Sequence, residues 1–137
     1  KHKKPAILTK VSHWLARRSE VLGMMDLSDG LLSDLKRVPS GQIEIFMEKI
    51  PHSDPLRNYC RDKNEDLFKF SLGGGEDYEL LLSCQSEKAN FLRVDFEKEF
   101  GTPLFEVGKV KPGSKSITYL YEGEEKELNF TSFKHFG

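Results

Sequence analysis

The chain has 137 residues, a length that suits one domain with its own hydrophobic core. Its 21 Lys and Arg residues nearly balance its 22 Asp and Glu residues, so the net charge of -1 gives no global reason to bind nucleic acid or an anionic membrane. Cys60 and Cys84 form no CxxC pair and have no histidine cluster nearby, which argues against a zinc site or a disulfide framework. Because no apolar run approaches the roughly 20 residues of a membrane span, we expect a soluble, cytoplasmic protein with reduced thiols.

The first part of the chain predicts a helix, a strand and a second helix. Pro5 suits the first position of a helix, and the apolar residues after it fall on one stripe. Residues 21–25 form an apolar run typical of a short buried strand, and residues 31–38 carry apolar side chains at helical spacing. The stripe of the first helix consists of Ile7, Leu8, Val11, Trp14 and Leu15, and that of the second of Leu31, Leu32, Leu35 and Val38.

Asp26, Ser28 and Asp29 fall at the junction between this strand and the second helix. The carboxyl end of a strand is the usual ligand crevice of an open α/β sheet. Carboxylates are hard ligands that suit Mg²⁺, and a hydroxyl beside the N–H groups of a helix start suits a phosphate. The alternative is an ordinary helix start, with Ser28 as the N-cap and Asp29 in the first turn, although such a cap does not require Asp26.

The middle of the chain predicts a second strand. Residues 39–41 form a turn signal, and residues 42–45 alternate polar and apolar side chains as a half-buried strand does. Between residues 50 and 70 the pattern is ambiguous, with a short helix beginning at residues 56–60 and a loop at residues 63–66.

A glycine-rich segment then introduces a third strand. Three glycines precede Glu76 and Asp77, and residues 78–83 predict a largely buried strand. The segment is neither a Walker A loop nor a dinucleotide fingerprint, because no Gly-Lys-Ser/Thr follows and a strand rather than a helix comes next. Glu76 and Asp77 are placed to accept hydrogen bonds from a ligand amine or to coordinate a cation, and a plain solvent loop is the alternative.

The last third predicts one helix and the strands that close the sheet. Ser86 is expected to cap a helix that runs to Phe100 and stops at Gly101. A strand over residues 104–110, a turn over 111–114 and a hairpin with arms at 116–121 and 126–130 follow, and the aromatic tail is expected to dock. The expected core residues of the helix are Ala89, Phe91, Leu92, Phe96 and Phe100.

Two segments carry a family resemblance. Residues 25–31 (MDLSDGL) and 74–80 (GGEDYEL), about fifty residues apart and followed by a Phe-x-His-Phe ending, resemble the C-terminal half of thiamine-monophosphate kinase. This kinase is a member of the aminoimidazole-ribonucleotide synthetase superfamily. The resemblance implies an α/β (α+β) fold with helices packed on a mixed β-sheet, and a single C-terminal domain over residues 1–137. It also implies transfer of the ATP γ-phosphoryl group to thiamine monophosphate, with Mg²⁺, to give thiamine diphosphate.

The resemblance also implies roles for individual residues. Phosphoryl transfer needs positioning and charge neutralisation more than a covalent nucleophile, so no catalytic residue is assigned. The implied roles are magnesium binding for Asp26 and Asp29, an ATP-phosphate contact for Ser28, and substrate binding for Glu76, Asp77 and Phe133.

Complete members of the family begin with another domain, which supplies most magnesium-binding aspartates, much of the ATP site and the dimer contact. We therefore expect the chain to be inactive alone, and the full-length protein to be a homodimer that binds thiamine monophosphate and ATP but no nucleic acid or membrane. Two alternatives stay open. One is a related synthetase, similar to selenophosphate or aminoimidazole-ribonucleotide synthetase, against which residues 76–79 argue. The other is a non-catalytic ligand-binding module.

Overall fold

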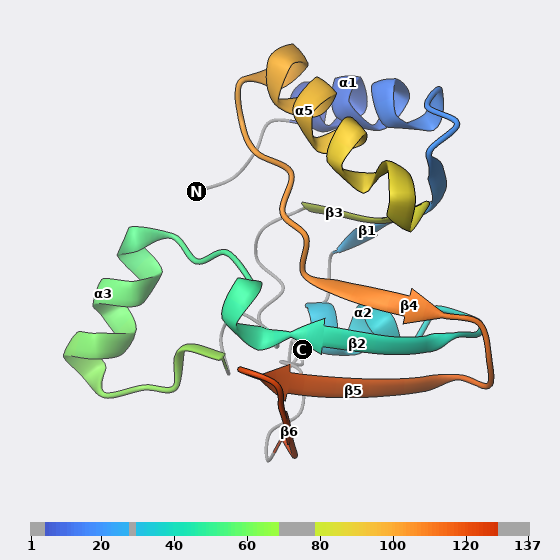
Figure 1. The fold of residues 1–137 in the computed structure, drawn as a ribbon. Coiled ribbons are helices and arrows are strands. Elements are labelled where there is room, and N and C mark those ends of the chain that lie inside the picture. Colours follow the sequence, from blue (N-terminus) through green and yellow to red (C-terminus); the bar gives the residue numbers. More distant parts are fainter. Residues whose placement is uncertain (1–4, 28–29, 69–78, 129–137) are drawn as a thin grey trace, which may run out of the picture. The chain divides into compact units, whose positions relative to one another are not determined.

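The computed structural model describes residues 5–27, 30–68 and 79–128, without the side chains of residues 5–8 and 79 (Figure 1). The chain divides into two compact units. The first unit contains residues 1–28 and 77–105, and the second contains residues 29–76 and 106–137. The prediction of one domain over residues 1–137 stays a prediction.

The first unit is a two-stranded ribbon with two helices packed on it. Its elements are α1 (Pro5–Ala16), β1 (Val21–Leu27), β3 (Glu79–Cys84) and α5 (Ala89–Phe100), with a 3₁₀ turn at Ser86–Lys88. The strands are antiparallel, with Met24 opposite Leu82 and an irregularity between Val21 and Gly23. Figure 1 shows α1 and α5 on the same side of this ribbon.

The core of the first unit lies between the helices and the ribbon. Leu15 of α1 and Leu92 and Phe96 of α5 are buried, and the strand residues Met24, Leu80 and Leu82 pack against them. Trp14 adds edge-to-face contacts, with its ring centroid 5.8 Å from that of Phe96. These apolar contacts hold the ribbon, because two strands alone are marginally stable in water.

Arg18 connects α1 to the rest of the first unit. Its Nε donates to Glu20 Oε1 at 3.1 Å, and its Nη2 donates to Asp95 Oδ2 on α5 at 2.8 Å. The guanidinium also lies 4.7 Å from the centre of the Trp14 ring, a cation–π distance. Chiefly through the hydrogen bond from Arg18, the pKa of Glu20 lies below its ordinary value.

The second unit is built on a four-stranded mixed sheet in the order β4-β2-β5-β6. β2 and β5 are parallel, and the other two pairs are antiparallel. Ile43 and Ile45 of β2 are buried, and Figure 1 shows α3 standing to one side of the sheet. The elements in chain order are α2 (Leu31–Leu35), β2 (Gln42–Phe46), a 3₁₀ turn (Met47–Lys49), α3 (Asp54–Lys63), β4 (Gly108–Lys111), β5 (Ser116–Tyr121) and β6 (Glu124–Lys126).

The structure confirms several predicted elements. The first helix begins at Pro5, and the alternation over residues 42–45 forms the half-buried strand β2. The short helix in the ambiguous region is α3, whose N-cap Ser53 accepts a hydrogen bond from the Leu56 N–H at 3.2 Å. Gly101 ends α5 in the left-handed conformation, with φ 72°.

Three predictions about the first unit are wrong. Ser86 does not cap α5, because residues 86–88 form the 3₁₀ turn and Lys88 holds the N-cap position without a side-chain bond. Phe91 is 66% exposed, since the buried stripe of α5 runs through Leu92 and Phe96 and leaves its neighbour about 100° away. The strands β1 and β3 are half-buried rather than buried, and Leu22 is largely exposed.

The strand limits in the second unit also differ from prediction. The strand expected over residues 104–110 is β4, which starts only at Gly108, because β2 ends at Phe46 and offers no longer partner. The hairpin turn is Glu122–Gly123, with φ 49° and 87°. Two positive φ values are typical of a type I′ turn, so residues 124 and 125 belong to β6 and not to the turn.

In the described part of the chain, every helix is too short or too polar to cross a membrane.

Candidate functional site

The pairing of β1 with β3 brings together the two segments that the sequence singles out. Leu27, the last residue of β1, lies opposite Glu79, the first residue of β3. The chain therefore leaves β1 toward residues 28–29 at the same end of the ribbon where it enters β3 from residues 76–77. Opposite Cα atoms in an antiparallel pair are about 4.5–5.5 Å apart, so the two segments start from neighbouring points.

Asp26 lies inside β1 and not beyond it. The expected junction position is wrong, because backbone pairing with β3 continues past Asp26, which is opposite Leu80, to Leu27. The side chain of Asp26 is exposed, whereas Met25 and Leu27 on either side are half-buried. Asp26 shares a face of the ribbon with Met24 and with the opposite residue Leu80, so its exposure comes from its place near the end of the ribbon and not from strand alternation.

The donor chemistry of Asp26 fits Mg²⁺. The ion prefers oxygen ligands and takes only one or two protein carboxylates when a nucleotide supplies the others. Within residues 5–27, 30–68 and 79–128, no group of three or more His, Cys, Asp or Glu side chains is arranged to hold a metal ion by itself. Asp26 thus has the chemistry of one carboxylate ligand of a magnesium ion.

Gly30 determines how the helix after this segment begins. It occupies the N-cap of α2, with φ 99° and ψ 153° and no side-chain cap bond. The alternative of an ordinary helix start with Ser28 as the N-cap is therefore wrong. Glycine is essentially the one residue that adopts this backbone region without strain. The helix itself is shorter than the spacing predicts, because it ends at Leu35 and leaves Val38 outside.

Asp34 is a buried carboxylate that the sequence analysis missed. Only 1% of it is exposed, and its Oδ1 accepts a hydrogen bond from Arg37 Nη2 at 3.0 Å. The signal was present in the sequence, because Asp34 is three residues after Leu31 and so shares the buried face of α2.

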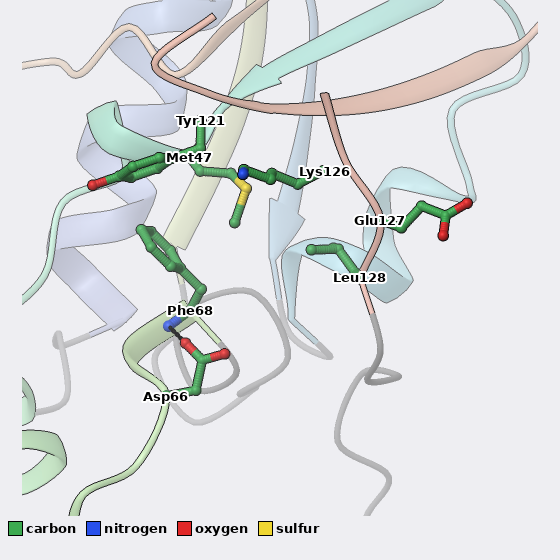
Figure 2. Close-up of a pocket in the computed structure, with 7 residues that line it drawn as sticks. All are labelled: Met47, Asp66, Phe68, Tyr121, Lys126, Glu127 and Leu128. Atoms are coloured by element: carbon green, nitrogen blue, oxygen red, sulfur yellow. Dashed lines mark hydrogen bonds between the residues drawn. The ribbon is translucent and has the colours of Figure 1, made fainter. Parts of the chain in front are cut away.

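A cavity of about 310 Å³ lies in the second unit (Figure 2). The rings of Phe68 and Tyr121 meet edge to face there, with centroids 5.8 Å apart. Asp66 Oδ1 accepts a hydrogen bond from the Phe68 N–H at 3.0 Å, as Figure 2 shows. The described residues that line the cavity are Met47, Asp66, Phe68, Tyr121, Lys126, Glu127 and Leu128. None of them is among the predicted site residues.

His52 lies next to this aromatic pair. Its ring is 5.7 Å from that of Phe68, and its Nε2 atom is buried without a hydrogen-bond partner among the described residues. Burial, and to a lesser degree the charge of Arg57, lowers the pKa of His52.

The remaining predicted site residues lie outside the described residues. They are Ser28, Asp29, Glu76, Asp77 and Phe133. Their roles stay predictions, and of the predicted set the structure places only Asp26.

Comparison with known proteins shows which family this sequence resembles. No protein-family model matches the chain. The chain is 34% identical over 116 residues to the thiamine-monophosphate kinase of Aquifex aeolicus, an alignment that covers 82% of the chain and 33% of that protein. The chain is a relative of thiamine-monophosphate kinase. The predicted resemblance is thus confirmed, and the chain spans 33% to 42% of the length of the curated thiamine-monophosphate kinases that it matches.

Solved structures agree with this relationship. A structure described as AaThiL complexed with AMPPCP and TMP matches with a TM-score of 0.64 and 26% identity, over 98% of this chain and 43% of that one. The hydrogenase maturation protein HypE of E. coli matches with a TM-score of 0.71 at 16% identity, over 93% of this chain and 40% of that one, and shows the fold alone. The predicted α/β fold with a mixed sheet is confirmed.

Proposed function

We propose that this chain is part of an ATP-dependent kinase that converts thiamine monophosphate to thiamine diphosphate with Mg²⁺. The observation that carries the proposal is the β1–β3 register, which starts both motif segments from one end of one ribbon. The relatives support it, because they are named thiamine-monophosphate kinases and one solved relative is described as complexed with AMPPCP, an ATP analogue, and TMP.

The proposed roles follow from the chemistry of the side chains. Asp26 and Asp29 hold Mg²⁺, and Ser28 contacts a phosphate of ATP. The ion neutralises charge on the transferred phosphoryl group, which is the main requirement of this reaction. The exposed carboxylate of Asp26 supports this role, because Mg²⁺ shared with a nucleotide needs few protein ligands.

The substrate side of the proposal rests on the segment that precedes β3. Glu76 and Asp77 bind thiamine monophosphate, where a carboxylate favours its cationic thiazolium ring or its amine. Phe133 contributes an aromatic contact. Glu76 is three residues from Glu79, and Asp29 is two residues from Leu27, so extended chain carries them at most about 11 Å and 7 Å from the ribbon end. The two segments therefore begin at neighbouring points of the β1–β3 ribbon.

The full-length protein is proposed to be a cytoplasmic homodimer. Its relatives are two to three times as long as this chain, and a preceding N-terminal domain is proposed to supply the rest of the magnesium and ATP site. We therefore expect no kinase activity from the 137 residues alone. Formation of thiamine diphosphate by the purified chain would contradict this expectation.

Ligand binding tests the proposal without requiring turnover. Isothermal titration calorimetry of the 137-residue chain with AMPPCP is expected to show binding that requires Mg²⁺ and disappears with EDTA. The variants Asp26→Asn and Asp29→Asn should each raise the Kd at least about 10-fold, since even outer-sphere partners of metal ligands cost that much. Asp62→Asn is the matched control, because Asp62 is exposed on α3 and 68% of its side chain is accessible.

Two outcomes of the titration would contradict the proposal. One is nucleotide binding that does not depend on Mg²⁺, and the other is an equal effect of all three substitutions. A parallel titration with thiamine monophosphate should weaken in Glu76→Gln. Binding of AMPPCP without any binding of thiamine monophosphate would favour the related synthetases instead.

A further inference from the structure

The cavity of about 310 Å³ in the second unit lies at the carboxyl ends of the parallel strands β2 and β5. β2 ends at Phe46, and the next residue, Met47, lines the cavity. Tyr121, the last residue of β5, lines it too. Open α/β sheets usually bind ligands in the crevice outside the carboxyl ends of their parallel strands. The volume lies at the lower limit of small-molecule pockets, about 300–1,000 Å³, so the place and the size both indicate a site for a small molecule.

The lining of this cavity offers aromatic and thioether surface. The rings of Phe68 and Tyr121 meet at 71°, with centroids 5.8 Å apart, and Figure 2 shows Met47 beside Tyr121. Tyr121 is 37% exposed, so part of its ring is open to a ligand. The face of an aromatic ring attracts cations, and the sulfur of methionine makes favourable contacts with rings. The surface therefore suits an aromatic ligand, and one with a positive charge in particular.

The charged groups beside the cavity are mostly negative. The segment 121–128, which borders it, has four Glu residues and one Lys. The ammonium of Lys126 lies 3.7 Å from the Glu124 carboxylate, which balances its charge. Glu48 adds a further carboxylate, since its Oε1 accepts a hydrogen bond from the Glu122 N–H at 2.9 Å. A surface with one sign of charge concentrates ligands of the opposite sign, so this end of the sheet favours a cation.

Asp66 places a carboxylate next to the aromatic rings. Its Oδ1 accepts a hydrogen bond from the Phe68 N–H at 3.0 Å, and this bond orients the group. Figure 2 shows the carboxylate of Glu127 pointing away from the other labelled side chains. Of the two carboxylates in the described lining, Asp66 is therefore the one beside the rings.

We propose that this cavity binds a small cationic aromatic compound, which packs against Phe68 and Tyr121 and directs its charge toward Asp66. A neutral ring would use only the apolar part of the lining, and an anion would be repelled by the glutamates. The inference uses none of the residues assigned in the proposed function, and it requires neither a phosphate nor Mg²⁺.

Nuclear magnetic resonance of ¹³C-labelled methionine methyl groups tests this binding in the 137-residue chain. The probe is N-methylquinolinium, which has a permanent positive charge, and quinoline, uncharged at neutral pH, is its matched neutral ligand. Met47 lines the cavity, whereas Met24 and Met25 belong to the first unit and serve as internal controls. Only the Met47 signal is expected to move, with a Kd on the order of 1 mM, a typical affinity for about ten non-hydrogen atoms. Quinoline should bind about 2–5-fold more weakly.

Two substitutions separate the charge from the ring. Asp66→Asn removes the charge but keeps an oxygen for the Phe68 N–H, and it should raise the Kd of the probe about 2–5-fold. Asp62→Asn is its control, because Asp62 is exposed on α3, and it should leave the Kd unchanged. Tyr121→Leu removes the ring but retains apolar bulk, and it should raise the Kd about 2–5-fold. Phe91→Leu, its control, changes an exposed ring of the first unit and should have no effect.

Four results would overturn the inference. One is a Met47 signal that stays fixed at probe concentrations well above the expected Kd. The second is equal binding of quinoline and N-methylquinolinium, because the charge would then play no part. The third is an equal effect of Asp66→Asn and Asp62→Asn. The fourth is a Kd that rises with EDTA or in Asp26→Asn, since the probe would then occupy the proposed magnesium site. Loss of Mg²⁺-dependent AMPPCP binding would contradict the proposed function alone, so the two hypotheses fail separately.

Discussion

Gly30→Ala tests the geometry of the segment between β1 and α2 directly. Gly30 is buried and has φ 99° and ψ 153°, a region that is essentially restricted to glycine. A residue with a Cβ held there costs about 1–3 kcal/mol. We therefore expect Gly30→Ala to reduce the free energy of unfolding by about that amount, or to shift the start of α2 and so relieve the strain.

The matched control is Gly101→Ala. Gly101 also has a positive φ, 72°, but it lies in the left-handed helical region at the end of α5, and a Cβ there would meet nothing within 4 Å. Its cost should be about 1 kcal/mol, from the left-handed conformation alone. Guanidinium denaturation followed by circular dichroism measures both variants, and the Mg²⁺ dependence of AMPPCP binding should change only in Gly30→Ala. If Gly30→Ala is as stable as the wild type and binds Mg²⁺-AMPPCP equally well, the described start of α2 is incorrect.

Three further predictions concern the two units. Gly108→Ala should destabilise the pairing of β4 with β2 by about 1–3 kcal/mol in guanidinium denaturation, because its Cβ would lie 2.1 Å from the Glu44 carbonyl oxygen. Gly23→Ala is the control. Its Cβ would lie 3.4 Å from the nearest side-chain atom, so the substitution should be nearly neutral. Leu92→Ala removes a side chain with 0% exposure from the first core and should cost about 2–5 kcal/mol by chemical denaturation, and a smaller loss would mean that the core refills the space. Because the pKa of Glu20 is lowered in the folded state, its contribution to stability is present above its ordinary pKa of 4.5 and is lost as pH falls through the folded value. Arg18→Gln should therefore make the melting temperature fall less steeply as the pH drops into the acid range. An unchanged dependence of the melting temperature on pH would show that the Arg18–Glu20 ion pair does not contribute to stability.

Local patterns predicted much of the fold because their physical causes are local. The alternation over residues 42–45 predicted β2, since Ile43 and Ile45 must share one face of a sheet, and both are buried. Gly101 was recognised as a helix stop because a left-handed C-terminal residue favours glycine. The same reasoning failed for Ser86, where a 3₁₀ turn competes with a simple cap and no short sequence pattern decides between them.

Pairing between distant segments could not be predicted in this way. The parallel contact of β2 with β5, which are about seventy residues apart, follows from the assembled sheet and not from either segment. The burial of Asp34 is a similar case, because helical spacing placed it on the apolar face but a charged residue is expected at the surface. Only the contacts of the folded chain show that Arg37 is its partner.

The position of Asp26 changes what the proposed site requires of the fold. A carboxylate in a loop would adapt to its ion, whereas one inside β1 is oriented by the ladder with β3. Side chains alternate along a strand, so a slip of one residue in this ladder would turn Asp26, together with Met24 on the same face, to the opposite face. The apolar residues Met24, Leu80 and Leu82 oppose that slip, because they pack on the core of the first unit only in the observed register. The core of this unit therefore sets both the stability of the ribbon and the direction in which Asp26 presents its oxygens.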